Sequence, residues 1–322
     1  MTSREIIWNT IRFKNSERLG RDFPEAYGGS DFGGIGMSPS PDGRPSKGVD
    51  EWGAVWENMG TTSVGEVKVF PLASWDDWET LNIPDIAMES RFEQMKGGRQ
   101  RAGDKFLLSY GISLYERVHF IRGLENTWMD IYDEPAKLGR LLDILVEMNL
   151  YAIKRYADEG ADGYIFPDDW GLQHRMMISP DKWREIWKPR YARVYKAAHD
   201  AGMATFLHSC GHIVDILDDL IDAGLDVIHM DQQENMGLEL LGRRFGGRLT
   251  FFSGVDIQTG LQRSNDEIRQ YCRRMAQHLG RPNGGLIPRW YTDPKGAGHR
   301  DDAIETMCDE FLKISREQYG RA

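Results

Sequence analysis

From about residue 134 onward the chain alternates between helical and extended patterns, and this alternation restricts the fold more than any other feature. Apolar residues recur at helical spacing over 134–159, and a short apolar run follows at 163–166. The succession then repeats, with extended runs at 204–210, 226–230, 249–253 and 286–287 and helical patterns at 179–201, 213–223, 238–243, 265–279 and 301–314. Strands that alternate with helices pair in parallel through right-handed crossovers. The sequence therefore predicts an α/β fold with a parallel sheet.

The number of strands decides between a closed and an open sheet. Six strands can be counted if residues 106–108 form the first, and two more are expected within 50–100, for example at 67–70. Eight strands close a (β/α)8 barrel, and 322 residues are enough for one. The sequence therefore favours a TIM barrel.

We expect one domain over residues 1–322, in which 101–322 form the regular β/α repeats. Residues 1–100 would supply the first strands and an N-terminal extension that caps one end of the barrel. A doubly wound open sheet is the alternative, but such a sheet more often carries a glycine-rich phosphate loop after its first strand. The glycine cluster at 28–34 follows no expected strand and precedes no expected helix, so it indicates a flexible loop.

Composition excludes several classes of function. A formal net charge of -10 argues against nucleic-acid or anionic-membrane partners, because phosphate binding needs clustered Lys and Arg. No apolar run approaches the length of a membrane span, and the first residues do not begin a signal peptide. Cys210, Cys272 and Cys308 show no disulfide framework spacing, which favours free thiols in a cytoplasmic protein.

The tetrad His208-Ser209-Cys210-Gly211 closes one of the expected strands. Because strand side chains alternate between two faces, His208 and Cys210 would point the same way. An imidazole and a thiol side by side at the carboxyl end of a parallel strand are typical of a metal site in a barrel. The alternative is an inert core cysteine beside a hydrogen-bonded histidine.

Acidic and polar side chains follow the neighbouring strands, at the end where a barrel binds its substrates. The expected catalytic carboxylates are those of Asp168, Asp169 and Asp256. The expected substrate contacts, all close behind strands, are Trp170, Gln173, Gln232, Trp290 and Tyr291. Each carboxylate could instead cap a helix or loop, and the aromatic residues could form a wall. Such polar groups repel and desolvate one another when they are crowded together, which costs stability. Their convergence at successive strand ends therefore favours a functional role over a structural one.

Short motifs spread along the chain carry a family resemblance. They are Asp50-Glu51-Trp52-Gly53, Gly65-Glu66-Val67, Gly160-Ala161-Asp162-Gly163, Asp168-Asp169-Trp170-Gly171, Ile178-Ser179-Pro180, His208-Ser209-Cys210-Gly211, Gly254-Val255-Asp256 and Gly284-Gly285. Together they are similar to the uroporphyrinogen decarboxylase superfamily, most strongly over about 130–290. The resemblance implies a (β/α)8 barrel. It also implies either porphyrinogen decarboxylation or zinc-assisted methyl transfer between a corrinoid and a thiol or other acceptor.

The resemblance is nearer to the zinc methyltransferase branch. That branch binds zinc through a His-x-Cys pair, which His208 and Cys210 match, and through a later cysteine that is missing here. Asp231 would then be the third ligand, because a carboxylate can complete a zinc site. The resemblance further implies a small methylated substrate, an ether or amine, and a cobalamin carried by a separate corrinoid protein.

Two other functions are left open. In a metal-free decarboxylase, Asp50 would stabilise a protonated pyrrole while Arg18 and Arg21 hold acid side chains, although the arginine motif of that branch is shortened here. The last alternative is a non-catalytic barrel whose strand ends hold a small ligand.

Overall fold

Seven parallel strands form one curled sheet, which confirms the expected α/β class. The computed structural model describes residues 1–58, 60, 65–291 and 298–320. Neighbouring strands follow the order β1, β5, β6, β7, β8, β9, β10, and every adjacent pair is parallel. Their bounds are β1 Phe32–Ile35, β5 Phe106–Tyr110, β6 Gly163–Pro167, β7 Ala204–His208, β8 Val227–His229, β9 Thr250–Ser253 and β10 Leu286–Pro288.

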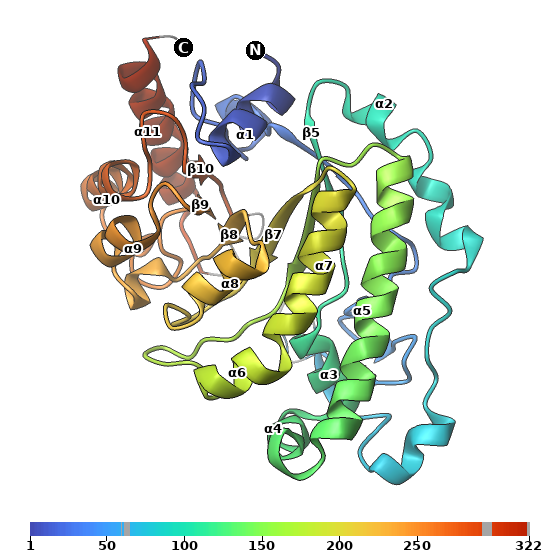
Figure 1. The fold of residues 1–322 in the computed structure, drawn as a ribbon. Coiled ribbons are helices and arrows are strands. Elements are labelled where there is room, and N and C mark those ends of the chain that lie inside the picture. Colours follow the sequence, from blue (N-terminus) through green and yellow to red (C-terminus); the bar gives the residue numbers. More distant parts are fainter. Residues whose placement is uncertain (59, 61–64, 292–297, 321–322) are drawn as a thin grey trace.

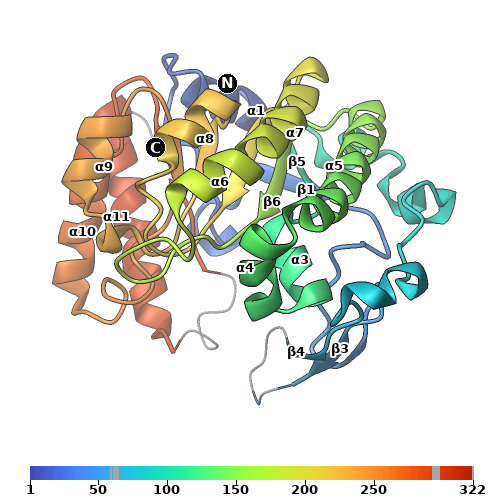
Figure 2. The same ribbon diagram turned by 60° about the horizontal axis from the view of Figure 1, so that its bottom comes forward.

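Helices cover the outside of this sheet (Figure 1, Figure 2). The α-helices are α1 Ser3–Ile11, α2 Gly98–Ala102, α3 Tyr115–Arg122, α4 Leu124–Asp133, α5 Pro135–Asp158, α6 Pro180–Ile186, α7 Lys188–Asp200, α8 Leu217–Ala223, α9 Leu238–Phe245, α10 Asn265–His278 and α11 Asp301–Tyr319. Short 3-10 helices are η1 Glu25–Tyr27, η2 Trp75–Thr80, η3 Glu89–Met95 and η4 Gln233–Asn235. The helix expected at 179–201 breaks at Trp187, because Pro189 lacks the N–H that would continue it. Among the described residues, no helix combines the length and apolarity that a membrane crossing requires.

The edge strands β1 and β10 are joined through a single residue. Asp22 forms a parallel bridge to Arg289, just beyond β10, and an antiparallel bridge to Ser30, just before β1. Its N–H donates to the carbonyl of Pro288 at 2.9 Å, and its carbonyl accepts from the N–H of Trp290 at 3.0 Å. Within the described residues, Asp22 therefore takes the place where an eighth strand was expected.

Side chains from alternate strand positions fill the interior of the sheet. Phe106, Phe206 and Phe252 lie in one buried cluster, with ring centroids 5.9 and 6.3 Å apart along that series. Ile7 and Ile11 of α1 join the same cluster, so α1 covers the amino-terminal ends of the strands. In Figure 1, α1 lies at the end of the molecule where both termini are found. Because α1 covers the amino-terminal ends of the strands, a binding site is expected at their carboxyl ends.

The expectation that the run at 67–70 is a barrel strand is wrong. Most of this run lies in β4 (Glu66–Val69), which pairs antiparallel with β3 (Val55–Glu57) in a separate sheet completed by β2 (Gly48–Val49). Figure 2 shows β3 and β4 outside the barrel. A β-type sequence pattern does not reveal which sheet the strand joins, because its pairing partners are set by tertiary packing.

The glycine cluster at 28–34 is not a loop throughout, because its last residues begin β1. A Cβ at Gly33 would lie 3.2 Å from the Cβ of Ala102, and one at Gly34 would lie 3.2 Å from the ring of Tyr110. These glycines therefore allow β1 to pack closely against its neighbours, which is a common reason for glycine in a strand.

Gly163, at the start of β6, is packed so closely against interior side chains that adding one methyl group would test how tightly the interior is packed. A Cβ there would lie 2.7 Å from the ring of Phe106 and 2.9 Å from that of Phe206. We expect Gly163→Ala to lower the free energy of unfolding by about 1–3 kcal/mol, because the rings must move to admit the methyl group. Urea denaturation followed by circular dichroism measures the change. In the control Gly36→Ala, whose Cβ would lie 3.8 Å from Tyr110, the loss should stay below about 0.5 kcal/mol. Equal losses would contradict this account of the interior.

Candidate functional site

The last inward-facing residues of β7 and β8 meet at the carboxyl end of the barrel. His208 lies opposite His229 in the parallel register, two residues beyond the interior pair Phe206 and Val227. Because strand side chains alternate, both imidazoles rise from the interior into the barrel mouth. Tyr110 ends β5 in the same way.

A cavity of about 380 Å³ occupies this mouth. It is lined by Ser40, Asp42, Tyr110, Gly111, Ile165, Pro167, His208 and His229. Binding sites for small molecules usually measure about 300–1,000 Å³, so this cavity suits a ligand at the small end of that range.

The turn after β7 fixes the position of the Cys210 thiol. The N–H of Cys210 donates to Oδ1 of Asp169 at 2.7 Å, and the N–H of Gly211 donates to Oε1 of Gln232 at 2.8 Å. Gly211 has a φ of 75°, and a Cβ there would lie 2.2 Å from the carbonyl oxygen of Gly171, so glycine is required. The loops after β6, β7 and β8 are thereby bound together around the thiol.

Three possible metal donors converge at this turn. The Sγ of Cys210 lies 3.5 Å from Nε2 of His208, and Oδ1 of Asp169 lies 3.6 Å from the same nitrogen. We refer to these three residues as the Cys210 triad. Donors bound at about 2.0–2.3 Å to one tetrahedral zinc ion lie about 3.3–3.6 Å apart, so the two distances from Nε2 of His208 suit zinc.

A second group of possible donors, the His229 triad, consists of His208, His229 and Asp231. The two Nδ1 atoms of the histidines are 3.0 Å apart, and Nε2 of His229 is 3.2 Å from Oδ1 of Asp231. Nη1 of Arg289 contacts Nε2 of His229 and lies 3.4 Å from Oδ1 of Asp231. Burial and the charge of Arg289 lower the pKa of His229 to about 3, so its ring is neutral near pH 7. Although burial favours the neutral acid, His229, His208 and Arg289 hold the pKa of Asp231 below its ordinary value.

Charge distinguishes the two triads as metal sites. The guanidinium of Arg289 lies against the His229 triad and would repel a cation bound between His229 and Asp231. Around Cys210, by contrast, burial and the charges of Asp169, Asp231 and Glu116 raise the pKa of the thiol above its ordinary value. These three carboxylates would attract a bound cation, whereas Arg289 would repel one. The Cys210 triad is therefore the better candidate.

Asp231 and Asp169 lie differently from the expectations based on sequence. Asp231, expected as the third metal ligand beside Cys210, groups with His208 and His229 instead and pairs with Arg289. Asp169, expected as a catalytic carboxylate, lies beside Cys210 in its place. In each loop that follows a strand, hydrogen bonds to other segments set the direction of the side chains. A sequence pattern does not specify these hydrogen bonds.

Asp168 and Trp170 support the site from behind, and neither side chain is exposed. The carboxylate of Asp168 accepts three backbone N–H groups at the start of α3 and the hydroxyl of Tyr191. Burial and the charge of Glu116 raise the pKa of Asp168 to about 8, but its oxygens are already engaged. Trp170 stacks on Tyr115 with ring centroids 3.7 Å apart and donates to Tyr191 at 3.0 Å. These contacts favour structural roles over the expected catalytic and substrate-binding ones.

Of the expected site residues only His208 lines the mouth cavity, and the ones not yet described are held in the surrounding loops. Asp256 is buried and accepts backbone N–H groups of its own loop at 2.8 and 3.0 Å, and the hydroxyl of Tyr291 donates to a loop carbonyl at 2.8 Å. Trp290 is partly buried against the core, and Gln173 is exposed in the loop after β6. Gln232 is bonded to the turn that holds the thiol, and so contacts the site from outside.

Sequence reasoning missed His229 as a site residue and assigned no role to Arg289 at the end of the last strand. His229 ends β8 at the register position that His208 has on β7, so equivalent strand ends were the available signal. Arg289 follows β10 two residues beyond the interior residue Ile287, which by alternation also directs it inward.

The arginines considered for a decarboxylase lie elsewhere. Arg18 pairs at 2.7 Å with Asp31, just before β1, and Arg21 donates to a backbone carbonyl in an exposed loop. Asp50 accepts from Arg117 at 2.8 Å. None of these residues lines the mouth cavity.

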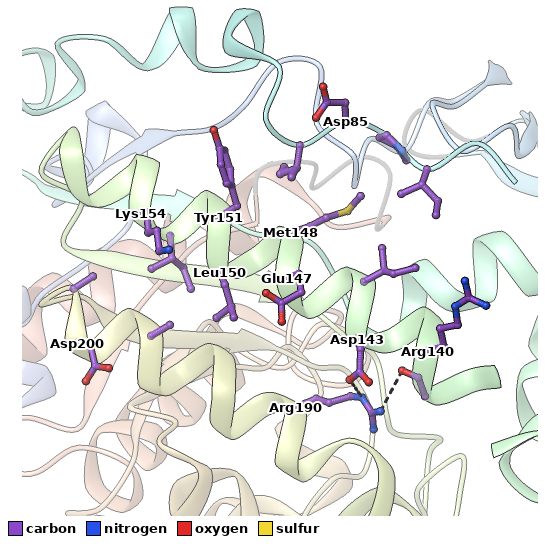
Figure 3. Close-up of a pocket in the computed structure, with 18 of the residues that line it drawn as sticks. Asp85, Arg140, Asp143, Glu147, Met148, Leu150, Tyr151, Lys154, Arg190 and Asp200 are labelled. Carbon is purple, nitrogen blue, oxygen red and sulfur yellow. Dashed lines mark hydrogen bonds and ion pairs between the residues drawn. The ribbon is translucent and has the colours of Figure 1, made fainter. Parts of the chain in front are cut away.

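A larger groove, of about 1380 Å³, lies on the outer surface and shares no lining residue with the mouth cavity. It follows α5, with residues 83–86 on one side and α7 on the other (Figure 3). Two of its charged groups, Arg190 and Asp143, pair with each other at 2.9 Å. Among the described residues it holds no cluster of metal donors, so its size alone does not make it the candidate site.

Comparisons with known proteins agree with this architecture. The sequence profile of a family described as uroporphyrinogen decarboxylase (URO-D) matches residues 112–287, more than half of the chain. A methyltransferase from Methanosarcina mazei is similar in structure with a TM-score of 0.67 and 15% identity, over 98% of this chain and 99% of that one. A B12-independent methionine synthase from Shewanella sp. W3-18-1 is similar with a TM-score of 0.49 and 11% identity, over 69% and 67%. No curated protein matches significantly. At 15% identity the likeness to the Methanosarcina mazei protein shows the fold alone, and the weaker likeness to the methionine synthase adds nothing to that conclusion.

The contacts of the two adjacent carboxylates predict unequal effects on stability. We expect Asp168→Ala to lower the free energy of unfolding by about 1–3 kcal/mol, because three backbone N–H groups at the start of α3 lose their acceptor. Asp169→Ala should cost less than about 1 kcal/mol, since that side chain is 36% exposed and accepts a single backbone N–H. Denaturant unfolding of both variants checks this. An Asp168→Ala protein as stable as the wild type would show that the carboxylate has no structural role.

Proposed function

Because the chain belongs to the uroporphyrinogen decarboxylase family, we propose that it is a zinc-assisted methyltransferase that acts on a small methylated substrate. The methyl group would pass between this substrate and a corrinoid or thiol. The observation that carries the proposal is the spacing of the Cys210 triad, which suits one zinc ion. Porphyrinogen decarboxylation has no evident use for an imidazole and a thiol side by side, whereas zinc-assisted methyl transfer uses both as ligands.

The residues of the mouth suit this chemistry. Zinc with three protein donors keeps a position open, where it polarises a methyl-bearing oxygen or nitrogen or lowers the pKa of an acceptor thiol. Ile165 and Pro167 give the cavity an apolar wall, while Asp42 and Tyr110 offer polar contacts. A cavity of about 380 Å³ suits a methoxylated aromatic compound or a methylamine better than a tetrapyrrole.

We propose that the cobalamin, where a corrinoid is the partner, is carried by a separate corrinoid protein. Such a protein would approach the carboxyl end of the barrel, because α1 fills the opposite end. The substrate would then lie between the Cys210 triad and the partner.

The arrangement gives less support to a metal-free decarboxylase. A tetrapyrrole with many acid side chains needs a cationic cleft. Here Arg18 and Arg21 lie outside the cavity lining, and Asp50 is engaged by Arg117. A non-catalytic barrel that holds a small ligand would need no metal, so metal analysis separates it from the proposed enzyme.

Zinc content tests the proposed site directly. We expect about one zinc ion per chain in protein purified without added metal, measured by elemental analysis. Cys210→Ser and His208→Ala should each lose most of this zinc, because two donors remain. Cys272→Ser is the matched control, since Cys272 is a free thiol buried in the core and should leave the zinc content unchanged. A metal-free wild type, or equal zinc in Cys210→Ser, would refute the site.

The reaction itself is tested by two assays on the same preparation. With methoxylated aromatics or methylamines and reduced cobalamin, we expect transfer of the methyl group to cobalt, falling to background in His208→Ala. With uroporphyrinogen, we expect no coproporphyrinogen, because the cavity is small and no arginine is among its lining residues. Decarboxylation at a useful rate that persists in His208→Ala would favour the alternative.

A further inference from the structure

We propose that His229 is a positioning residue, which together with Asp231 fixes the ring of His208 so that its Nε2 faces the metal. The inference rests on the proposed function, since it concerns the same zinc site. It adds two residues that do not bind the metal but decide how one of its ligands is presented. The group that accepts the second ring N–H of a metal-binding histidine is usually a carboxylate, a backbone carbonyl or a water molecule, whereas here a second imidazole lies between the ligand and the carboxylate.

The geometry gives His208 two different sides. Its Nε2 lies 3.5 Å from Sγ of Cys210 and 3.6 Å from Oδ1 of Asp169. Its Nδ1 lies 3.0 Å from Nδ1 of His229, which is a hydrogen-bond distance. The Nε2 edge of the ring is therefore available to a cation, and the Nδ1 edge is occupied by a hydrogen bond.

The position of the ring hydrogen on His208 determines that on His229. When a cation binds Nε2 of His208, the ring hydrogen must be on Nδ1, which donates to the bare Nδ1 of His229. The hydrogen of His229 is then on Nε2, 3.2 Å from the carboxylate of Asp231, which accepts it. Each donor thus meets an acceptor from His208 to Asp231, and the metal-binding nitrogen is the one left bare.

Arg289 favours the opposite arrangement when no cation is bound. Its Nη1 contacts Nε2 of His229, and an arginine can only donate. His229 then carries its hydrogen on Nδ1 and donates to His208, whose own hydrogen is on Nε2 and faces Cys210. Binding of a cation would therefore shift both ring hydrogens toward Asp231, and Arg289 would turn to that carboxylate, which lies 3.4 Å from Nη1.

Adjoining strand ends hold the two rings in place. The parallel register sets His208 opposite His229, and the ring of His229 packs against Phe252 with centroids 5.4 Å apart. The side chains of His229 and Asp231 are only 11% and 12% exposed, so water cannot easily replace either partner. We refer to the hydrogen-bonded series His208–His229–Asp231 as the relay. Its rings are held by the pairing of β7 with β8.

Zinc affinity measured by competition with a chromophoric chelator tests the relay. We expect His229→Phe, which keeps a ring but removes both nitrogens, to weaken zinc binding by about 10- to 100-fold. His229→Asn should recover most of this loss, because its amide oxygen can accept near the place of Nδ1. His199→Phe is the matched control: His199 also pairs with a carboxylate, Asp226, at 2.8 Å, but lies outside both triads, and zinc affinity should not change.

The absorption of the cobalt-substituted protein supplies a second readout. A shifted visible band in His229→Phe is expected, because His208 is held in a changed orientation, whereas a partly unfolded protein would lose intensity without a shift. Should His229→Phe fail to fold, Asp231→Ala carries the same test, because it removes the oxygen that accepts from His229. Unchanged zinc affinity in a folded variant, with zinc still dependent on Cys210, would overturn the relay alone. A wild type that binds no zinc would overturn both the relay and the proposed function.

Discussion

The parallel register of β7 and β8 is the constraint on which the candidate site depends. It sets His208 opposite His229, and alternation along each strand places both rings above an interior packed with Phe206 and Phe252. Neither ring can withdraw into that interior, so the two meet at 3.0 Å. A site built on adjoining strand ends takes its precision from the backbone ladder rather than from a flexible loop.

Small residues let the loops above this register approach each other. Gly211 lies so close to Gly171 that no side chain fits between the loops after β6 and β7. The hydroxyl of Ser209 accepts the N–H of Trp170 at 3.2 Å, which adds a further link. The thiol of Cys210 is therefore held by backbone contacts that would persist with or without a metal ion.

Charge divides the mouth into two halves around a shared imidazole. On one side of His208, Arg289 neutralises Asp231 and opposes a bound cation. On the other side, Asp169 accepts the N–H of Cys210 and lies 3.6 Å from Nε2 of His208, where it could also bind a metal. The same histidine thus has one nitrogen suited to a metal and one suited to a hydrogen bond, which is how buried metal ligands are commonly oriented.

The sequence by itself determined the class of fold and the pairing of His208 with Cys210. Both follow from local periodicity: helix and strand spacing reports burial, and residues two apart near a strand end lie on the same side. Residues 28–34 show the limit, since a glycine-rich segment has no apolar pattern, and β1 was recognised only through its pairing with β5. The family resemblance also came from short motifs alone, and the match over 112–287 confirmed it.

Only the tertiary structure decided which carboxylate belongs to which group. Asp168 and Asp169 are adjacent, yet one is bonded to the start of α3 and the other to the N–H of Cys210. No periodicity separates neighbours in a loop, because their directions depend on hydrogen bonds to segments far away in the chain. For the same reason the partner of His208 could not be read from sequence: His229 is 21 residues away, and only the pairing of β7 with β8 brings the rings together.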